Sequence, residues 1–244
     1  MVAAGRAAAG PPLGAVMITA ALAGCVQMPG AGMAPTAAIM RPAPPANSFV
    51  EVVERVEPVA EGMCRASAPR GVNCDLEIMV DPRPDQQPNA FQTVDDRGRP
   101  VVVFTLTLIA AAQNADEIAF VLGHEAAHHI AGHIPRRQQT AAEGAMLGAV
   151  FAEATGADQA TMAQLQRMGA ELGARRFSKE FELEADALGA EITWRAGFDP
   201  VRGTGFFDRL PDPGDQFLGS HPANAQRRAQ VAAVVAQLEG WPAY

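Results

Sequence analysis

Two histidines and one glutamate in a short stretch have the residue types and spacing for metal-dependent hydrolysis. His124, Glu125 and His128 form the pattern His-Glu-x-x-His. Positions four apart share one face of a helix, so both imidazoles can reach a single Zn²⁺ at about 2.0–2.1 Å. Glu125 then points beside the metal, where it can take a proton from a zinc-activated water. The pattern should arise by chance in well under about 1% of chains this long, so it predicts a site for one zinc ion.

The neighbouring histidines do not extend this ligand set. His129 is rotated away from His128, and an ideal helix would place His133 on roughly the opposite side from His124. A longer pattern with a third histidine ligand would need that histidine at Ile134. The third protein ligand is therefore expected from another part of the chain.

A later acidic segment offers that third ligand. Glu182 and Asp186 are four residues apart and share one face of a helix, while Ala185 is small enough for a close helix–helix approach. Glu182 is predicted to ligate zinc. Asp186 is predicted to accept a hydrogen bond from a liganding imidazole and so to fix its orientation.

Other acidic residues leave alternatives to this assignment. Glu143 and Glu153 lie in a glycine-containing segment and are weaker candidates for the ligand. Glu180, Glu182 and Glu184 could together form a solvated acidic face that binds no metal. Glu184 is expected to point away from the site.

The order of these motifs resembles the gluzincin-type zinc peptidases related to HtpX, BepA and the CAAX prenyl proteases. The resemblance rests on His-Glu-x-x-His followed by Glu-x-x-x-Asp, and it runs from about Phe49 to Leu238. Phe177 with Ser178, and His221 with Pro222 and Arg227, are similar to further motifs of this family, as is the segment Asn89, Ala90 and Phe91. Lys179 departs from the arginine that many members carry. Multiple membrane spans and a helical-repeat extension are not expected, so the resemblance is to a short periplasmic lipoprotein member.

The resemblance implies zinc-dependent cleavage of polypeptides. Asn89, Ala90 and Phe91 correspond to a strand beside the active-site helix, along which substrate backbone could add as a further strand. The developing oxyanion needs a donor besides the metal. His221 lies outside the histidine cluster and is assigned to the site as oxyanion donor or fourth ligand; the alternative is a structural histidine at a helix start.

The first residues carry signals for export. Arg6 precedes an apolar run that is too short to span a bilayer, so residues 1–24 are interpreted as a lipoprotein signal peptide. Cys25 ends a sequence that looks like a bacterial lipobox and is predicted to be lipidated, with an ordinary signal peptide as the alternative. Val26 after it favours the outer membrane over the inner membrane. Residues 25–47, rich in proline and alanine, are predicted to form a tether.

Cysteine content and charge narrow the possibilities further. Cys64 and Cys74 form an even pair close in sequence, which in an oxidising compartment favours a disulfide over two buried thiols. The net charge of -8 argues against nucleic-acid binding, because phosphate recognition needs a basic face.

The apolar periodicities predict an α+β domain over residues 48–244 that is mostly helical, with a small sheet beside the His-Glu-x-x-His helix. A capping box at Ser48 and Glu51 predicts a helix that stops at Gly62. Strands are predicted over 76–80, 89–91 and 101–104, and helices over 114–131, 178–194 and 224–238. Residues 138–172 are predicted to form two helices broken near Gly156, as a lid or as a packed hairpin.

These observations predict a zinc endopeptidase in the bacterial periplasm that cleaves misfolded or unassembled envelope proteins. The alternative is a zinc-bound chaperone or assembly lipoprotein whose proteolysis is silent or gated. A purely structural metal site is disfavoured, because such a site has no use for the base Glu125.

Overall fold

A computed structural model describes residues 46–175, 178–209 and 222–239 of the chain. Helices dominate this part of the chain, and a small sheet lies among them, which confirms the α+β class. The helical elements are α1 (Ala46–Ser67), α2 (Leu106–Ala111), α3 (Ala115–Ile130), α4 (His133–Ala154), α5 (Gln159–Arg175), α6 (Ser178–Arg195), α7 (Pro200–Gly203), the 3₁₀ helix η1 (Thr204–Arg209) and α8 (Asn224–Glu239). The strands are β1 (Glu77–Asp81), β2 (Ala90–Val94) and β3 (Pro100–Thr105).

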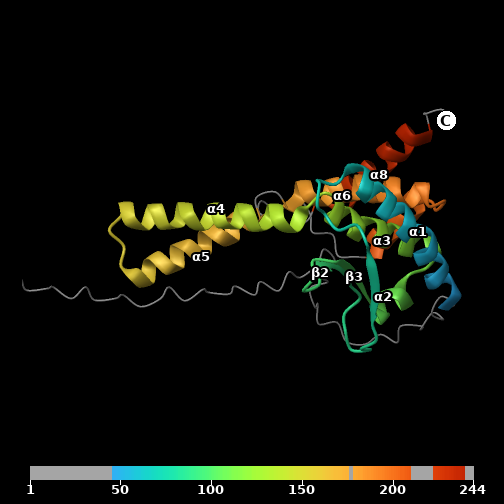
Figure 1. Cartoon of the computed structure of the whole chain (residues 1–244), viewed down its shortest axis with the longest axis horizontal. Coiled ribbons are helices and arrows are strands. Elements are labelled where there is room, and N and C mark those ends of the chain that lie inside the picture. Colours follow the sequence, from blue (N-terminus) through green and yellow to red (C-terminus); the bar gives the residue numbers. More distant parts are fainter. Residues whose placement is uncertain (1–45, 176–177, 210–221, 240–244) are drawn as a thin grey trace, which may run out of the picture.

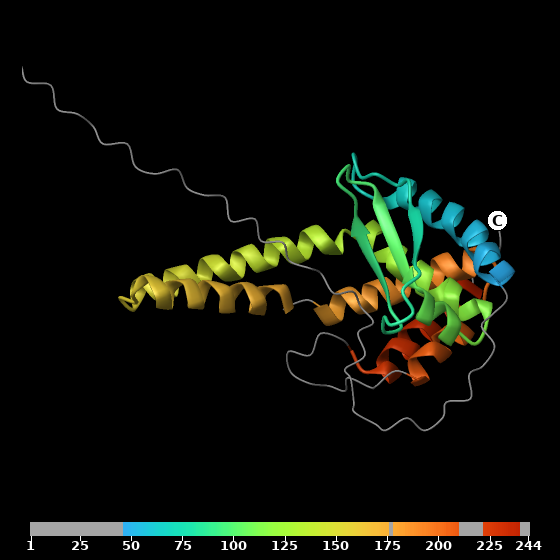
Figure 2. The ribbon, with the colours of Figure 1, turned by 90° about the horizontal axis from the view of Figure 1, so that it is seen from below.

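The molecule has a body and a long projection (Figure 1). Helix α3 runs through the body, where it contacts α1, α6, α7 and strands β2 and β3. Almost every residue of α3 is buried. Helices α4 and α5 form a hairpin that extends away from this body (Figures 1 and 2).

The sheet has three strands in the order β1-β3-β2 (Figure 2). Strand β3 pairs with β1 in parallel and with β2 in antiparallel register, with Phe91 opposite Val103. Among the described residues, β2 therefore forms an edge of the sheet. This edge strand contacts α3, the helix that carries the His-Glu-x-x-His pattern.

The main core lies between α1, the sheet, α3 and α6. Val52 and Val56 of α1 recur at helical spacing and are fully buried against this core, as are Phe104 of β3, Leu122 of α3 and Ile192 of α6. Burying such side chains stabilises the fold by roughly 1.5–3 kcal/mol each. The central helix is thus held from several sides.

Helix α1 is longer than its sequence signals predicted. It begins at Ala46, two residues before Ser48, and it continues through Gly62 to Ser67. The stop at Gly62 was wrong because the residues beyond it, including the buried Cys64, pack on the core and so extend the helix. The short elements α2, α7 and η1 were not predicted.

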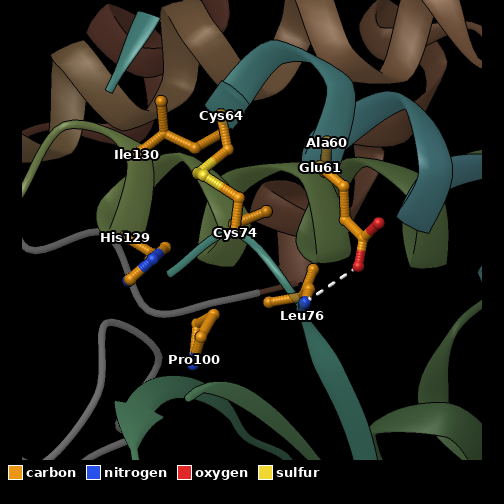
Figure 3. Close-up of a pocket in the computed structure, with 9 residues that line it drawn as sticks. Ala60, Glu61, Cys64, Cys74, Leu76, Pro100, His129 and Ile130 are labelled. Carbon is orange, nitrogen blue, oxygen red and sulfur yellow. Dashed lines mark hydrogen bonds between the residues drawn. A yellow bond between two sulfur atoms is a disulfide. The ribbon is translucent and has the colours of Figure 1, made fainter. Parts of the chain in front are cut away.

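Cys64 and Cys74, the pair expected to form a bridge, are joined by a disulfide with their Cα atoms 5.7 Å apart. The bridge ties the end of α1 to the segment that leads into β1, beside a small pocket that His129 also lines (Figure 3). Glu61 strengthens the same junction, because its carboxylate accepts a 3.0 Å hydrogen bond from the backbone N–H of Leu76.

The turn of the hairpin contains Gly156, where the sequence predicted a break between the two helices, and the φ of this residue is 67°. Helices α4 and α5 pack along each other, which is the packed-hairpin alternative of the sequence prediction. Glycines line their contact: a Cβ on Gly144 would stand 2.0 Å from the carbonyl oxygen of Gly169. None of the helices in the described part of the chain has the length and apolar character needed to cross a membrane.

Candidate metal centre

Helix α3 places the three residues of the His-Glu-x-x-His pattern in the interior. Its start is fixed by the capping residue Asn114, whose side-chain oxygen accepts a 3.1 Å hydrogen bond from the Glu117 N–H in the first turn. His124, Glu125 and His128 are 3%, 1% and 7% exposed. A charged or polar group buried to this extent needs partners, and α6 provides them for the two histidines.

Helix α6 approaches α3 at glycine. A Cβ on Gly189 would stand 2.8 Å from both the Cα and the backbone N of His124, and a Cβ on Gly123 would stand 2.8 Å from the Gly189 carbonyl oxygen. Ala185, one turn before Gly189, is fully buried. The small residues thus let the two backbones meet, which brings the Glu182 carboxylate to the histidines.

Donor atoms of His124, His128 and Glu182 converge on one point. The two Nε2 atoms are 3.1 Å apart, and each lies 3.6 Å from an oxygen of Glu182. All three residues are buried, and their ligand atoms lie within 4.8 Å of one another. Two imidazole nitrogens and one carboxylate oxygen match the donor set of a three-ligand zinc site that keeps a position open.

Asp186 and Arg227 surround the outer side of His124. The Asp186 Oδ1 atom is 3.0 Å from the His124 Nδ1, and Arg227 donates two 2.7 Å hydrogen bonds to the same carboxylate. Burial alone would lower the pKa of His124, but its contacts with Asp186 and Glu182 raise that pKa to about 9. A cation that binds here must displace this proton.

Arg227 is a site residue that the sequence did not assign. It is 3% exposed, and its guanidinium lies over the ring of Phe207 at 4.1 Å from the centroid. It holds Asp186 in a fork geometry that lysine cannot reproduce. Arg227 follows His221 and Pro222 in a motif similar to one of the family, which hints at a place near the site. Only the packing of α8 on α6 shows that Arg227 is buried there.

Glu125 lies between the ligand group and the edge strand. Burial raises the pKa of its carboxyl to about 7, and the nearby His124 and the backbone N–H of Gln92 in β2 offset part of that effect. Its Oε1 atom is buried and has no hydrogen-bond partner among the described residues. A buried acceptor of this kind is costly unless something binds it, which fits a site for a cation and a reacting water.

His133 was predicted on the far side of the helix from His124, and the structure places it beside His128 instead. The ideal-helix projection fails because α3 ends at Ile130 and Gly132 turns the chain with a φ of 66°. The Nδ1 atoms of His128 and His133 are 2.7 Å apart. Burial lowers the pKa of both rings, and it holds the pKa of His128 well below its usual value.

Glu184 points away from the three converging donors, as expected, but it does not lie in an isolated acidic face. Its Oε2 atom is 3.1 Å from the His133 Nε2 and 2.7 Å from the Arg136 Nη1. Glu143 lies on the hairpin and accepts a hydrogen bond from Gln139, outside the ligand group. Glu153 also lies on the hairpin, near the far end of α4.

The structure also describes the predicted substrate strand and His129, but not His221 or Cys25. Asn89 directly precedes β2, and its N–H donates to the Thr105 hydroxyl at 2.9 Å, so this segment forms the strand beside α3. His129 takes no part in the ligand group, because its Nε2 lies 2.7 Å from the Asn73 carbonyl oxygen. His221 and Cys25 lie outside the described residues.

Comparisons with known proteins agree with this geometry. The model of Peptidase family M48 matches residues 52–235. The chain is similar to the mitochondrial metalloendopeptidase OMA1 of Saccharomyces cerevisiae, with 30% identity over 196 residues, 74% of this chain and 52% of the relative. It is 31% identical to the beta-barrel assembly-enhancing protease of Escherichia coli K12 over 143 residues, 53% of this chain and 29% of the relative.

A third relative is the metalloprotease LoiP of Escherichia coli K12, 28% identical over 121 residues that cover 48% of each chain. The chain thus spans about half, or less, of the length of these curated relatives. The family match nevertheless includes α3 and α6, and with them every residue of the converging ligand group. The chain belongs to Peptidase family M48.

Proposed function

We propose that this protein is a zinc-dependent endopeptidase that cleaves misfolded or unassembled envelope proteins. The observation that carries the proposal is the buried Glu125, which lies next to three converging donors and has an unpaired carboxylate oxygen in the described part of the chain. A structural metal site would need four closed ligands and no neighbouring base. A base beside an incomplete ligand set is the arrangement of a hydrolase.

His124, His128 and Glu182 would hold one zinc ion per chain. Zinc, when bound, lowers the pKa of water and polarises the scissile carbonyl. Glu125 takes a proton from the attacking water and passes it to the leaving amine, a role that suits a carboxyl whose pKa is raised to about 7 by burial. Asp186 keeps the His124 ring oriented through its Nδ1.

Substrate would bind as an added strand along β2. The backbone groups of alternate β2 residues face β3, and those of Ala90, Gln92 and Val94 face the free edge. Gln92 lies close enough to Glu125 to affect its pKa, so a strand along this edge would place its peptide bond near the base. Main-chain pairing tolerates many sequences, which suits unfolded polypeptides as substrates. We assign His221 as oxyanion donor or fourth ligand.

The proposed location is the bacterial periplasm, with a lipid on Cys25 and the outer membrane as the anchoring membrane. Its support is the lipobox-like sequence that ends at Cys25, together with the similarity to a beta-barrel assembly-enhancing protease. The second candidate is a zinc-bound chaperone with gated proteolysis. It is favoured by large apolar side chains that the hairpin exposes to solvent, such as Leu147 and Phe151.

Casein cleavage by wild type and by Glu125→Gln, at matched zinc content, tests the proposal. We expect Glu125→Gln to lose about 10²–10⁴-fold in rate, because that is what a positioned general base contributes. Glu143→Gln, a change at an exposed glutamate of the hairpin, is the matched control and should cut as wild type does. Equal cleavage by Glu125→Gln would refute the role of the base. Zinc binding without cleavage in all three proteins would favour the chaperone.

A further inference from the structure

Each of the two histidines in the ligand group needs a hydrogen-bond partner at its outer nitrogen, Nδ1. Each turns its Nε2 toward the common point, which leaves each Nδ1 facing outward. A metal-bound imidazole needs a partner at that second nitrogen to fix its tautomer and its direction. Asp186 is that partner for His124. At His128 the corresponding place, 2.7 Å from Nδ1, is taken by the Nδ1 of His133.

The ring protons of His133 and His128 can be assigned by starting from Glu184, which lies next to His133. Glu184 is an acceptor, and it already receives the Arg136 guanidinium at 2.7 Å. The His133 Nε2, 3.1 Å from the same oxygen, must therefore carry the proton. In a neutral imidazole the other nitrogen then has a lone pair, so His133 Nδ1 accepts from the N–H of His128 Nδ1. This leaves the His128 Nε2 lone pair directed to the metal position.

Packing holds His133 in this role. Its side chain is 5% exposed, and its ring stacks on Phe181 with centroids 4.6 Å apart and an angle of 12° between the planes. The Arg136 guanidinium lies 4.3 Å from the centroid of the same Phe181 ring. Phe181 directly precedes Glu182 in α6. His133 is thus locked against the helix that supplies the carboxylate ligand.

We propose that His133 is a positioning residue of the metal centre, which fixes the tautomer and direction of His128 through a His128–His133–Glu184 hydrogen-bond chain. The hydrogen-bond chain begins at His128 of α3, passes through His133 at the start of α4 and ends at Glu184 of α6, which Arg136 anchors. The inference rests on the proposed ligand set but not on peptidase activity, so it is tested through metal binding.

Zinc affinity, measured by competition with a chromogenic chelator, separates hydrogen bonding from packing at this position. His133→Phe keeps an aromatic ring for Phe181 but cannot accept from His128, and we expect about 10–100-fold weaker zinc binding. His133→Asn places an amide oxygen near the position of Nδ1, and we expect it to restore most of the affinity. His129→Ala changes the adjacent histidine that bonds the Asn73 carbonyl instead, and should bind as wild type.

Two further readouts exclude a general loss of fold. The metal-free His133→Phe protein should melt close to wild type, and its Co²⁺ complex should show an altered visible spectrum that His133→Asn restores. If His133→Phe does not fold, Glu184→Ala replaces it, because removal of this half-exposed carboxylate frees the His133 tautomer and should also weaken zinc binding.

Wild-type affinity in His133→Phe, or in Glu184→Ala where it replaces that variant, would overturn the proposal. Equal losses in His133→Phe and His133→Asn would also overturn it, because the effect would then come from packing. If the affinity pattern holds while casein is not cut, the positioning role stands and the peptidase assignment fails. If casein is cut while the variants bind zinc as tightly as wild type, the peptidase assignment stands and the positioning role fails.

Discussion

Two helix pairs, α3 with α6 and α4 with α5, meet at glycine, but they differ in what surrounds the contact. A Cβ on Gly123 would stand 2.8 Å from the Gly189 carbonyl oxygen in the first pair, and a Cβ on Gly144 would stand 2.0 Å from that of Gly169 in the second. Helix α3 is almost entirely buried, whereas no residue of α5 is buried and α4 buries only His133 and Ala152.

A close approach of two helices positions functional side chains only where a core holds both helices in place. In the body, the approach sets the distance from Glu182 to the two histidines, and the sheet, α1 and α8 hold the helices in place. In the hairpin, the same contact joins two helices whose large side chains face outward. The buried His133, at the first residue of α4, belongs to the metal centre.

Gly189→Ala should produce the largest effect. The added methyl group would stand 2.8 Å from the His124 backbone, so α6 must move away from α3 and take Glu182 with it. We expect a loss of about 1–3 kcal/mol in the free energy of unfolding, the usual cost of overpacking a core. Zinc affinity should fall as well, because the carboxylate ligand is displaced from the histidines. Urea unfolding of the metal-free protein and chelator competition measure the two effects separately.

Gly62→Ala is the control for that experiment. A Cβ at Gly62 meets nothing within 4 Å, and the residue lies inside α1, so alanine should leave stability unchanged or raise it by up to about 1 kcal/mol. Zinc affinity that stays at the wild-type value in Gly189→Ala would show that the α3–α6 contact does not set the ligand distance.

Gly144→Ala should have a smaller effect that is confined to the hairpin. Its methyl group would stand 2.0 Å from the Gly169 carbonyl oxygen, so the two helices must separate locally. Hydrogen exchange should accelerate in α4 and α5, while protection in α3 and the affinity for zinc stay at wild-type values. A loss of zinc affinity would contradict the separation of the two regions and would indicate transmission through the start of α4.

Local signals made much of this architecture predictable from the sequence. The spacing of His124, Glu125 and His128 needs only helix geometry, and the capping residue Asn114 marks where that helix begins. The pairing with Glu182 needed one further inference, namely that Ala185 lets the second helix approach. Features within one element were therefore accessible, and so was one contact between two elements.

Other features that depend on how elements pack were not accessible. The role of His133 depends on the left-handed turn at Gly132, which ends the helical projection used to place it. Arg227 becomes part of the site only because α8 packs on α6, and a single sequence cannot distinguish a buried arginine from an exposed one. Likewise, strand register, which backbone pairing determines, brings Gln92 close enough to Glu125 to lower the pKa of that carboxyl.

The exposed apolar side chains of the hairpin give the smallest expected effect. Large ones at 49–70% exposure are Met146, Leu147, Val150, Phe151, Met168 and Leu172. Leu147→Gln with Phe151→Gln should change the free energy of unfolding by no more than about 0.5 kcal/mol, because these side chains are already in water. Thermal unfolding at two protein concentrations measures this. A larger, concentration-dependent loss would mean that another copy of the chain covers these side chains in solution, so that the hairpin, like the body, buries its apolar residues.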